Sequence, residues 1–238
     1  MSDTDHRAIT ARYLLAGGLA APLFVVVALV ESALRAGYVW QDRFVSELSL
    51  GDSGWIQVTN FLVTGVCLLA FAAGLRRVLP TGKGRRAAPV LAAVCGAGLI
   101  VAGLFTMDPS PGYPVGGTVP AHPTVHGQIH GYAPFAVFLS LAALSFVLAR
   151  RFAGEAAPRV WMWYSIATGI LVPATFMAGA ATYDFVTQTG HNHGVWQRIS
   201  LAIGFAWLGV LAVRLMREHA GSRRETPSPV AGGVKPNR

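Results

Sequence analysis

Long uncharged stretches of apolar residues alternate with short polar segments along the whole chain. Six of them are candidates for membrane-spanning helices, because about 20 helical residues cross the roughly 30 Å of hydrocarbon in a bilayer. They are residues 13–30, 53–75, 87–107, 131–149, 160–183 and 199–213. The last stretch is short unless Arg198 lies at membrane depth, and Glu31 directly after the first argues against a cleaved signal peptide. The pattern therefore predicts an all-α membrane bundle of six transmembrane helices.

No segment outside these stretches is long enough to form a soluble domain. We expect a short N-terminal segment at residues 1–12, a transmembrane domain at 13–217 and a basic tail at 218–238. The tail is rich in Ser, Pro, Gly and Arg, a composition typical of disordered segments. Only 13% of the residues are charged and the mean hydropathy is +0.48, whereas soluble domains carry about 25% charged residues. An ordinary soluble enzyme is therefore excluded.

The basic residues are divided very unequally between the two sides of the expected membrane. Of the 19 Lys and Arg, 16 fall at the N-terminus, in segments 76–86 and 150–159, or in the tail. The three on the opposite side are Arg35, Arg43 and Arg198. Because Lys and Arg collect on the cytoplasmic side, we expect both termini in the cytoplasm and the bundle in the plasma membrane. The net charge of +8 then reflects topology, and no nucleic-acid partner is expected.

Ionisable residues gather at the outer ends of the spans. The outer side holds six of the eleven Asp and Glu and five of the seven His. Counted at about 1.5 Å per residue from the nearest inner arginine, five groups from five spans reach a similar depth of about 28–37 Å. These five are Glu31, Asp108, His130, Asp184 and Arg198. The layer predicts a shared polar site with Asp108, Glu31 and Arg198 as candidate catalytic residues, although helix ends also carry polar residues for structural reasons.

Three histidines, His122, His126 and His130, recur at every fourth position where the fourth span begins. On a helix this spacing places them on one face, and Gly127 and Gly131 would let a neighbouring helix approach closely. Two histidines one turn apart, completed by an acid from another helix, could hold zinc or another divalent metal. All three are therefore candidate metal ligands. A metal-free acid–base or ligand-binding site and a structural or pH-sensitive cluster explain the same pattern.

The outer loops add residues that could contact a substrate. The first loop contains Glu47 and Ser49. The second contains Tyr113 within a run of Pro and Gly that is typical of fixed turns, so this loop could form a lid over the polar layer. Together with Asp184, these residues are candidates for substrate binding. A further histidine pair, at positions 191 and 193, is interpreted as part of a flexible loop.

Arg198 needs a partner if it lies near the hydrocarbon. An unpaired arginine at the centre of a membrane helix costs at least about 2.5 kcal/mol. We therefore expect Arg198 to face the bundle interior and to pair with an acid of the polar layer, either Glu31 or Asp108. The alternative is that its long side chain reaches outward to the lipid headgroups.

Short motifs along the chain resemble those of one family of membrane proteins. They are Ser46-Glu47-Leu48-Ser49, Gly54-Trp55, Asn60-Phe61, Gly74-Leu75-Arg76-Arg77, Gly103-Leu104-Phe105, Asp108-Pro109, Gly112-Tyr113-Pro114, His126 and His130. Over residues 15–215 the chain resembles the polytopic bacterial and archaeal proteins grouped as domain of unknown function 998. This resemblance implies a six-span bundle but no established activity. A looser likeness to alkaline-ceramidase-type hydrolases, which place Ser, Asp and three His around zinc, differs in the order of the motifs.

These observations leave several functions open. One is a metal-dependent hydrolase or transferase acting on a lipid-like substrate, in which a metal-bound water attacks an ester or amide. The alternative is a non-catalytic membrane accessory protein or a pH or ligand sensor. A small transporter is less favoured, because the deep interior is apolar whereas transporters place polar groups near the bilayer midplane. The expected partners are membrane lipids and a lipid-like small molecule.

Overall fold

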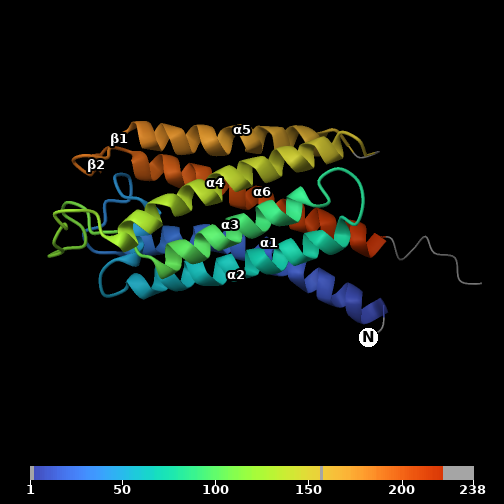
Figure 1. Cartoon of the computed structure of the whole chain (residues 1–238), viewed down its shortest axis with the longest axis horizontal. Coiled ribbons are helices and arrows are strands. Elements are labelled where there is room, and N and C mark those ends of the chain that lie inside the picture. The colour runs from blue at the N-terminus through green and yellow to red at the C-terminus, as the bar shows by residue number, and fades with distance from the viewer. Residues whose placement is uncertain (1–2, 156–157, 222–238) are drawn as a thin grey trace, which may run out of the picture.

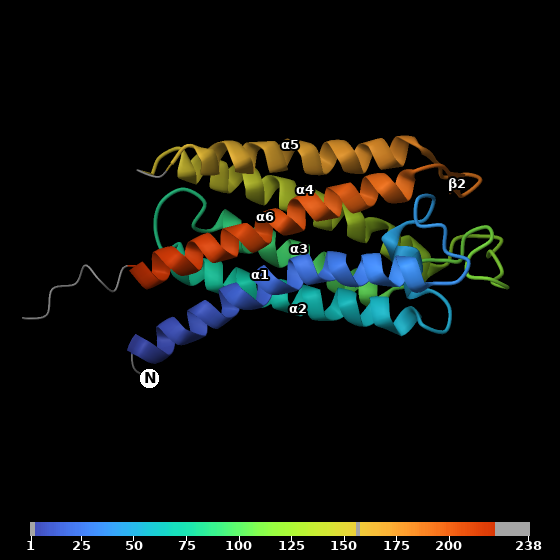
Figure 2. The same cartoon turned by 180° about the vertical axis from the view of Figure 1, so that it is seen from behind.

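The computed structural model describes residues 3–155 and 158–221, which form a bundle of six long helices (Figures 1 and 2). The helices are α1 (Asp3–Leu34), α2 (Gly54–Val78), α3 (Ala87–Leu104), α4 (Val125–Phe152), α5 (Val160–Ala181) and α6 (His193–Gly221). All six are long and apolar enough to cross a membrane, which confirms the predicted all-α bundle. The connections contain a short 3-10 helix, η1 (Val45–Ser49), and a small hairpin of β1 (Tyr183–Asp184) and β2 (Thr189–Gly190).

The helices extend beyond the uncharged stretches at several ends. Helix α1 begins at Asp3, so most of the segment 1–12 is helical, and α6 runs from His193 to Gly221. Residues 218–221 are therefore helical rather than disordered, and the rest of the expected tail lies outside the described residues. The reason is that a charge-free stretch marks only the hydrocarbon depth, whereas a helix can continue into the headgroup region, where charged side chains are solvated.

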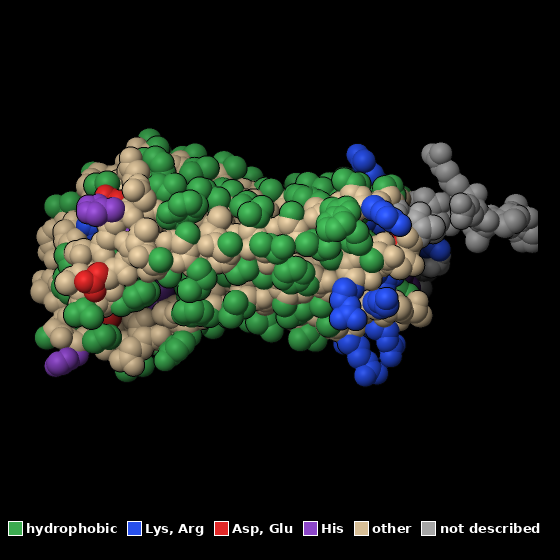
Figure 3. All heavy atoms as spheres, turned by 90° about the horizontal axis from the view of Figure 1, so that it is seen from above, with side chains coloured by type: hydrophobic (Ala, Val, Ile, Leu, Met, Phe, Trp, Pro, Cys, Tyr) green, Lys and Arg blue, Asp and Glu red, His purple; other side chains and the backbone are tan. Residues whose placement is uncertain are grey.

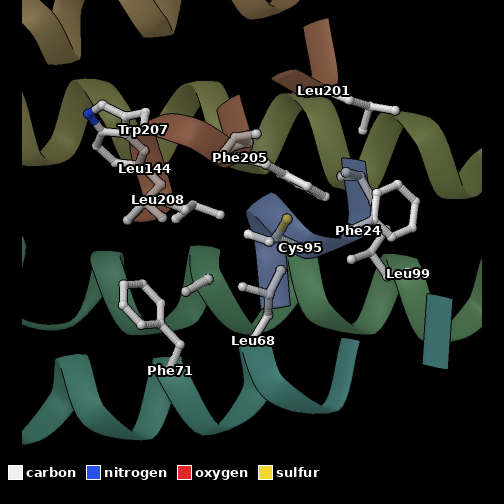
Figure 4. Close-up of a cluster of buried hydrophobic side chains, with 14 of the residues drawn as sticks. Phe24, Leu68, Phe71, Cys95, Leu99, Leu144, Leu201, Phe205, Trp207 and Leu208 are labelled. Atoms are coloured by element: carbon white, nitrogen blue, oxygen red, sulfur yellow. The ribbon is translucent and has the colours of Figure 1, made fainter. Parts of the chain in front are cut away.

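The six helices close into a ring. Each helix packs against its neighbours in the chain, and α6 packs back against α1. Apolar side chains from the inward faces fill the space between them (Figure 4). They include Phe24, Leu68, Phe71, Cys95, Leu99, Leu144, Leu201, Phe205, Trp207 and Leu208. Phe24 meets Phe205 edge to face, with 5.4 Å between the ring centroids, so close packing of side chains holds the ring together.

The two ends of the bundle carry different chemistry (Figure 3). On the face shown, most Lys and Arg gather at the end where α1 begins and α6 ends, whereas the visible Asp, Glu and His lie towards the opposite end. We refer to this opposite end as the outer end. It holds the three outer loops, residues 35–53, 105–124 and 182–192. The positive-inside rule would turn it away from the cytoplasm, and that orientation stays a prediction.

Candidate functional site

A cavity of about 410 Å³ lies at the outer end. The outer parts of α4, α5 and α6 enclose it together with residues from all three outer loops. Its walls are mostly apolar, with Phe135 from α4 and Phe176 and Met177 from α5. A small number of polar side chains interrupt these walls, among them His130 and His193. An apolar hollow with a few fixed polar groups is typical of small-molecule sites, so we take this outer cavity as the candidate functional site.

Two buried histidines line the outer cavity from different helices. His130 of α4 is 4% exposed, and its Nδ1 lies 2.7 Å from the carbonyl oxygen of Phe105. His193, the first residue of α6, packs its ring against Phe44 and Tyr183 at centroid distances of 4.5 and 4.8 Å. One ring nitrogen of each, Nε2 of His130 and Nδ1 of His193, is buried without a hydrogen-bond partner in the described part of the chain. Each histidine therefore keeps one ring nitrogen that is unpaired within the described residues and covered by neighbouring side chains.

The predicted column of three histidines does not form. Helix α4 begins at Val125, and the side chain of Thr124 caps it by accepting a hydrogen bond from the Gly127 amide at 3.0 Å. His122 therefore precedes the helix and is exposed, and His126 is exposed with its ring near Phe105. The spacing of the histidines suggested a helix that includes His122. Thr124 lies between His122 and His126 and caps α4, so the helix begins after His122.

The histidines also do not assemble a metal centre in this structure. Among residues 3–155 and 158–221, no group of three or more His, Cys, Asp and Glu side chains is placed to hold a metal ion. Zinc bound by protein side chains needs at least three ligands around one point. His122, His126 and His130 are therefore not brought together as a ligand group in the described residues.

Asp108 lines the outer cavity, but its carboxylate is occupied by the start of α4. Its Oδ2 accepts from the Thr124 amide at 2.9 Å and its Oδ1 from the Thr124 hydroxyl at 2.6 Å. A carboxylate at a helix N-terminus is also stabilised by the helix dipole. A Cβ atom added at Gly127 would overlap the carboxylate. Gly127 therefore makes room for Asp108 rather than for a neighbouring helix, and Gly131 faces open space.

We expect Gly127→Ala to destabilise the protein by about 1 kcal/mol, the usual value of a lost helix cap. The added methyl group would push Asp108 away from Thr124. In an Asp108→Ala background the same change should be neutral or slightly stabilising, because alanine favours helix more than glycine. Thermal unfolding of the four variants of this cycle in detergent tests the coupling, and equal effects in both backgrounds would contradict it.

Glu31 and Tyr113 lie in a second hollow, away from the two buried histidines. Glu31 of α1 forms an ion pair with Arg35 at 2.7 Å, and the Arg35 guanidinium also donates to the carbonyls of Leu48, Leu50 and Ser53. Tyr113 borders the same hollow, and burial raises the pKa of its phenol. Glu31 Oε2 and the Tyr113 hydroxyl are buried without partners in the described residues. The predicted polar layer is therefore divided between two hollows.

Glu47 joins the first outer loop to the second. The buried carboxylate of Glu47 accepts hydrogen bonds from the Ser110 hydroxyl and from Arg43, the latter at 3.4 Å. Arg43 also donates to the Ser110 hydroxyl and, at 2.7 Å, to the Pro111 carbonyl. Burial raises the pKa of the Glu47 carboxyl despite these donors. Ser110 lines the outer cavity, so its hydrogen bond connects Glu47 to the cavity wall.

Glu47 should make the stability of the outer loops depend on pH. Because burial raises its pKa in the folded state, the folded protein holds this proton more tightly than the unfolded chain. Stability should therefore be highest below the unfolded pKa and should fall as pH rises through the folded pKa. As pH rises above the ordinary carboxyl pKa of 4.5, we expect the unfolding temperature of Glu47→Gln to change less than that of the wild type.

The pH dependence of the unfolding temperature is compared between the wild type and Glu47→Gln, so contributions from groups that titrate alike in both proteins cancel. The charged and titratable groups around Glu47 are Arg43, Tyr38, Tyr113 and Tyr183, and burial raises the pKa of each of the three tyrosines, that of Tyr183 to about 12. Their charge therefore does not change in this pH range. An unchanged pH slope in Glu47→Gln would contradict the assignment.

The other two candidate substrate-binding residues shape loops. The Ser49 hydroxyl donates to the Ser46 carbonyl at 2.7 Å within η1. Asp184 accepts from the amides of Val186 and Thr187 at 2.8 and 3.2 Å, and these amide donors lower its pKa. Neither side chain lines the outer cavity.

Arg198 points into the bundle, as predicted, but its partners are different from those expected. Arg198 is 7% exposed, and its guanidinium donates five hydrogen bonds of 2.6–3.0 Å. The acceptors are the carbonyls of Trp40, Arg43 and Gly194 and the hydroxyls of Ser32 and Tyr38. Carbonyls and hydroxyls thus replace the predicted ion pair with Glu31 or Asp108, because the first outer loop folds back over the start of α6.

The sequence interpretation missed several residues of the outer cavity. His193 was assigned to a flexible loop because Gly and Asn surround it, yet it is buried and begins α6. Only the exposed His191, 3.7 Å from Asp42, matches that interpretation. The sequence pattern did not distinguish Ser110 and Gln197 as site residues. The one available signal was that polar Gln197 and Arg198 begin an apolar stretch, which indicates polar contacts at the outer end of α6.

Comparison with known proteins identifies a family but not an activity. A family model described as "Protein of unknown function (DUF998)" matches residues 19–214. No curated protein and no solved structure matches the chain. The candidate site must therefore be interpreted from its own geometry.

Proposed function

Because the chain belongs to the DUF998 family, whose description assigns no activity, we propose a function from the geometry: the outer cavity binds a lipid-like amphiphile. The observation that carries this proposal is an apolar cavity of about 410 Å³ lined by two buried histidines with free ring nitrogens. Ligand cavities are usually about 300–1,000 Å³, mostly apolar, with a few polar groups that orient the ligand.

The border of the outer cavity supports entry from the lipid phase. Phe135 of α4 and Met177 of α5 both line it and are 49% and 56% exposed. Exposed apolar side chains on a transmembrane helix face lipid, so this border is a path along which an acyl or alkyl chain could enter. The polar part of such a molecule would then lie near His130 and His193 at the outer end.

A variant that fills the cavity tests this proposal. Gly131 lines the outer cavity, and a Cβ atom added there meets no other atom within 4 Å. Gly131→Leu should therefore fold normally. It should weaken binding by about tenfold or more, because the added side chain and the ligand would compete for the same space, and overpacking costs about 1–3 kcal/mol. The measurement is saturable labelling of detergent-purified protein by a photoreactive long-chain methyl ether.

Leu139→Trp is the matched control. Leu139 lies on the lipid-facing side of the same helix and is 55% exposed, so added bulk there should leave labelling unchanged. Equal labelling of the wild type and Gly131→Leu would exclude the outer cavity as the binding site. Binding without chemical change of the ligand would match the role of an accessory protein or ligand sensor.

Hydrolysis or group transfer on the bound lipid is a second candidate function, favoured by the contact of Ser110 with Glu47. Ser110 lines the outer cavity and donates its hydroxyl proton to a carboxylate whose pKa is raised by burial, and a raised pKa suits a general base. Ser110 Oγ would attack an acyl carbon while Glu47 takes the proton and returns it to the leaving alcohol. Water would then release the acyl group.

This second candidate makes a distinct prediction. Ser110→Ala should abolish turnover of a long-chain acyl ester while the methyl ether still binds. Turnover that persists in Ser110→Ala would rule out this nucleophile. If neither the wild type nor any variant turns over esters, the proposed binding function stands alone.

A further inference from the structure

We propose that the ligand of the outer cavity carries a hydroxyl headgroup and that His130 accepts the hydrogen bond of this hydroxyl. The cavity would therefore select neutral lipid alcohols over fatty acids and phosphate-bearing lipids. This inference rests on the proposed lipid-binding function and specifies the chemistry of the polar part of the ligand.

The protonation of His130 follows from its contact with Phe105. The Nδ1 atom lies 2.7 Å from a backbone carbonyl oxygen, and a carbonyl oxygen can only accept a hydrogen bond. Nδ1 must therefore carry the hydrogen. In a neutral imidazole this leaves a lone pair on Nε2. That atom is the buried ring nitrogen without a partner among the described residues, so it is an unused acceptor, which a ligand hydroxyl would reach by displacing the side chains that cover it.

The surroundings favour the neutral imidazole. A second proton on His130 would place a charge on a ring that is 4% exposed, and an unpaired buried charge is strongly unfavourable. Among the described residues that line the outer cavity, Asp108 is the only charged one. Both of its oxygens already accept from Thr124. His130 is thus available as an acceptor rather than as a cation.

The same lining disfavours anionic headgroups. A carboxylate or phosphate would meet Asp108, which is negative, and none of the described lining residues is Lys or Arg. Anions bind where cationic side chains or several amide donors converge. A hydroxyl, in contrast, needs only one acceptor for its hydrogen and one donor for its oxygen.

Gln197 supplies a donor of the required kind. Its side-chain oxygen accepts from the Val45 amide at 2.7 Å, which fixes the orientation of the amide group and leaves its NH₂ group for other partners. Gln197 lines the outer cavity together with His130. Pro134 is also in the lining and cannot donate to the His130 carbonyl one turn earlier. The lining therefore offers two acceptors and a donor without a fixed positive charge.

Three probes with one common alkyl chain test the inference on the full chain in detergent. They are a long-chain alcohol, the corresponding methyl ether and the corresponding carboxylate. The alcohol should bind about tenfold more tightly than the ether, because the ether cannot donate to His130 and a buried acceptor left unpaired costs about 1–3 kcal/mol. The carboxylate should bind more weakly than the alcohol.

Variants at His130 separate this contact from general binding. In His130→Phe the affinity for the alcohol should fall to that for the ether, while the affinity for the ether stays unchanged and so reports an intact cavity. His130→Gln retains an acceptor and should restore part of the preference. His126→Phe, an exposed histidine of the same helix, should change nothing.

The outcomes distinguish this inference from the proposed function. If all three probes bind equally and Gly131→Leu still weakens them, the outer cavity binds lipids but the hydroxyl preference is wrong. Tightest binding of the carboxylate, or an alcohol preference that survives in His130→Phe, would also overturn the inference. If Gly131→Leu leaves the binding of every probe unchanged, the proposed function itself fails.

Discussion

Replacing Arg198 with methionine is expected to lower the unfolding free energy of the bundle by about 3 kcal/mol or more, because each buried polar group left without a partner costs about 1–3 kcal/mol. The guanidinium of Arg198 connects the first turn of α6 to α1 and to the first outer loop. Removing it would leave the carbonyls of Trp40 and Arg43 without their 2.9 Å donor contacts. The hydroxyls of Ser32 and Tyr38 would also lose the donor from which they accept, and would keep their own bonds to the carbonyls of Ala28 and Phe44.

The shape of the guanidinium matters as much as its charge. One of its terminal nitrogens, Nη1, serves three carbonyls, and the other, Nη2, serves two hydroxyls. Lysine carries the same charge on a single nitrogen and cannot reproduce this planar fork. We therefore expect Arg198→Lys to be destabilised almost as strongly as Arg198→Met.

Thermal unfolding in detergent, followed by loss of helical circular dichroism, measures the effect. Arg76→Met is the matched control, because Arg76 is an exposed arginine at the opposite end of the bundle. An unfolding temperature of Arg198→Lys equal to that of the wild type would show that charge alone is sufficient. An Arg198→Met variant as stable as Arg76→Met would contradict the role of the whole network.

The direction of Arg198 was predictable from the sequence, but its partners were not. The cost of a basic side chain near the hydrocarbon favours an inward direction. Three of the five acceptors, however, belong to the first outer loop, at Tyr38, Trp40 and Arg43, more than 150 residues earlier in the chain. Counting charges in a sequence identifies candidate acidic partners. It gives no information about backbone carbonyls, whose positions depend on how the loop folds.

The same distinction explains the rest of the site. Hydrocarbon thickness sets the length of each span, so the number of helices follows from apolar stretches alone. Residue counts along a helix give height above the membrane, and Glu31 near the end of α1, Asp108 after α3 and His130 near the start of α4 do lie towards the outer end. Height does not give the direction in which a side chain faces. Glu31 therefore borders a different hollow from His130.

Local signals were ambiguous where one residue decided the geometry. Thr124 ends the histidine column by capping α4, and a Ser, Thr, Asp or Asn before a helix is recognisable only when the helix start is already known. His193 was hidden by Gly and Asn neighbours that suggest a loop. In the folded protein, Phe44 and Tyr183 from two different loops pack against the His193 ring and bury it beside the cavity.

Gly65 should be the most sensitive position in the contact between α2 and α3. A Cβ atom added at Gly65 would lie 2.7 Å from the Gly96 carbonyl oxygen and 2.6 Å from Cγ1 of Ile100, and one added at Gly96 would lie 2.7 Å from the Gly65 carbonyl oxygen. The two backbones therefore touch directly, as small residues allow in membrane helix pairs. The Ile100 side chain can move, but a backbone carbonyl cannot without separating the helices.

We expect Gly65→Leu to destabilise the bundle by about 3 kcal/mol, at the upper end of the usual effect of overpacking, and Gly65→Ala by less. Val66→Leu is the control, because Val66 is the next residue of α2 and is 59% exposed. Thermal unfolding should therefore rank Val66→Leu with the wild type, then Gly65→Ala, then Gly65→Leu. Since helix propensity alone would make alanine better than glycine, an increase in stability for Gly65→Ala would mean that α2 and α3 are not in direct backbone contact.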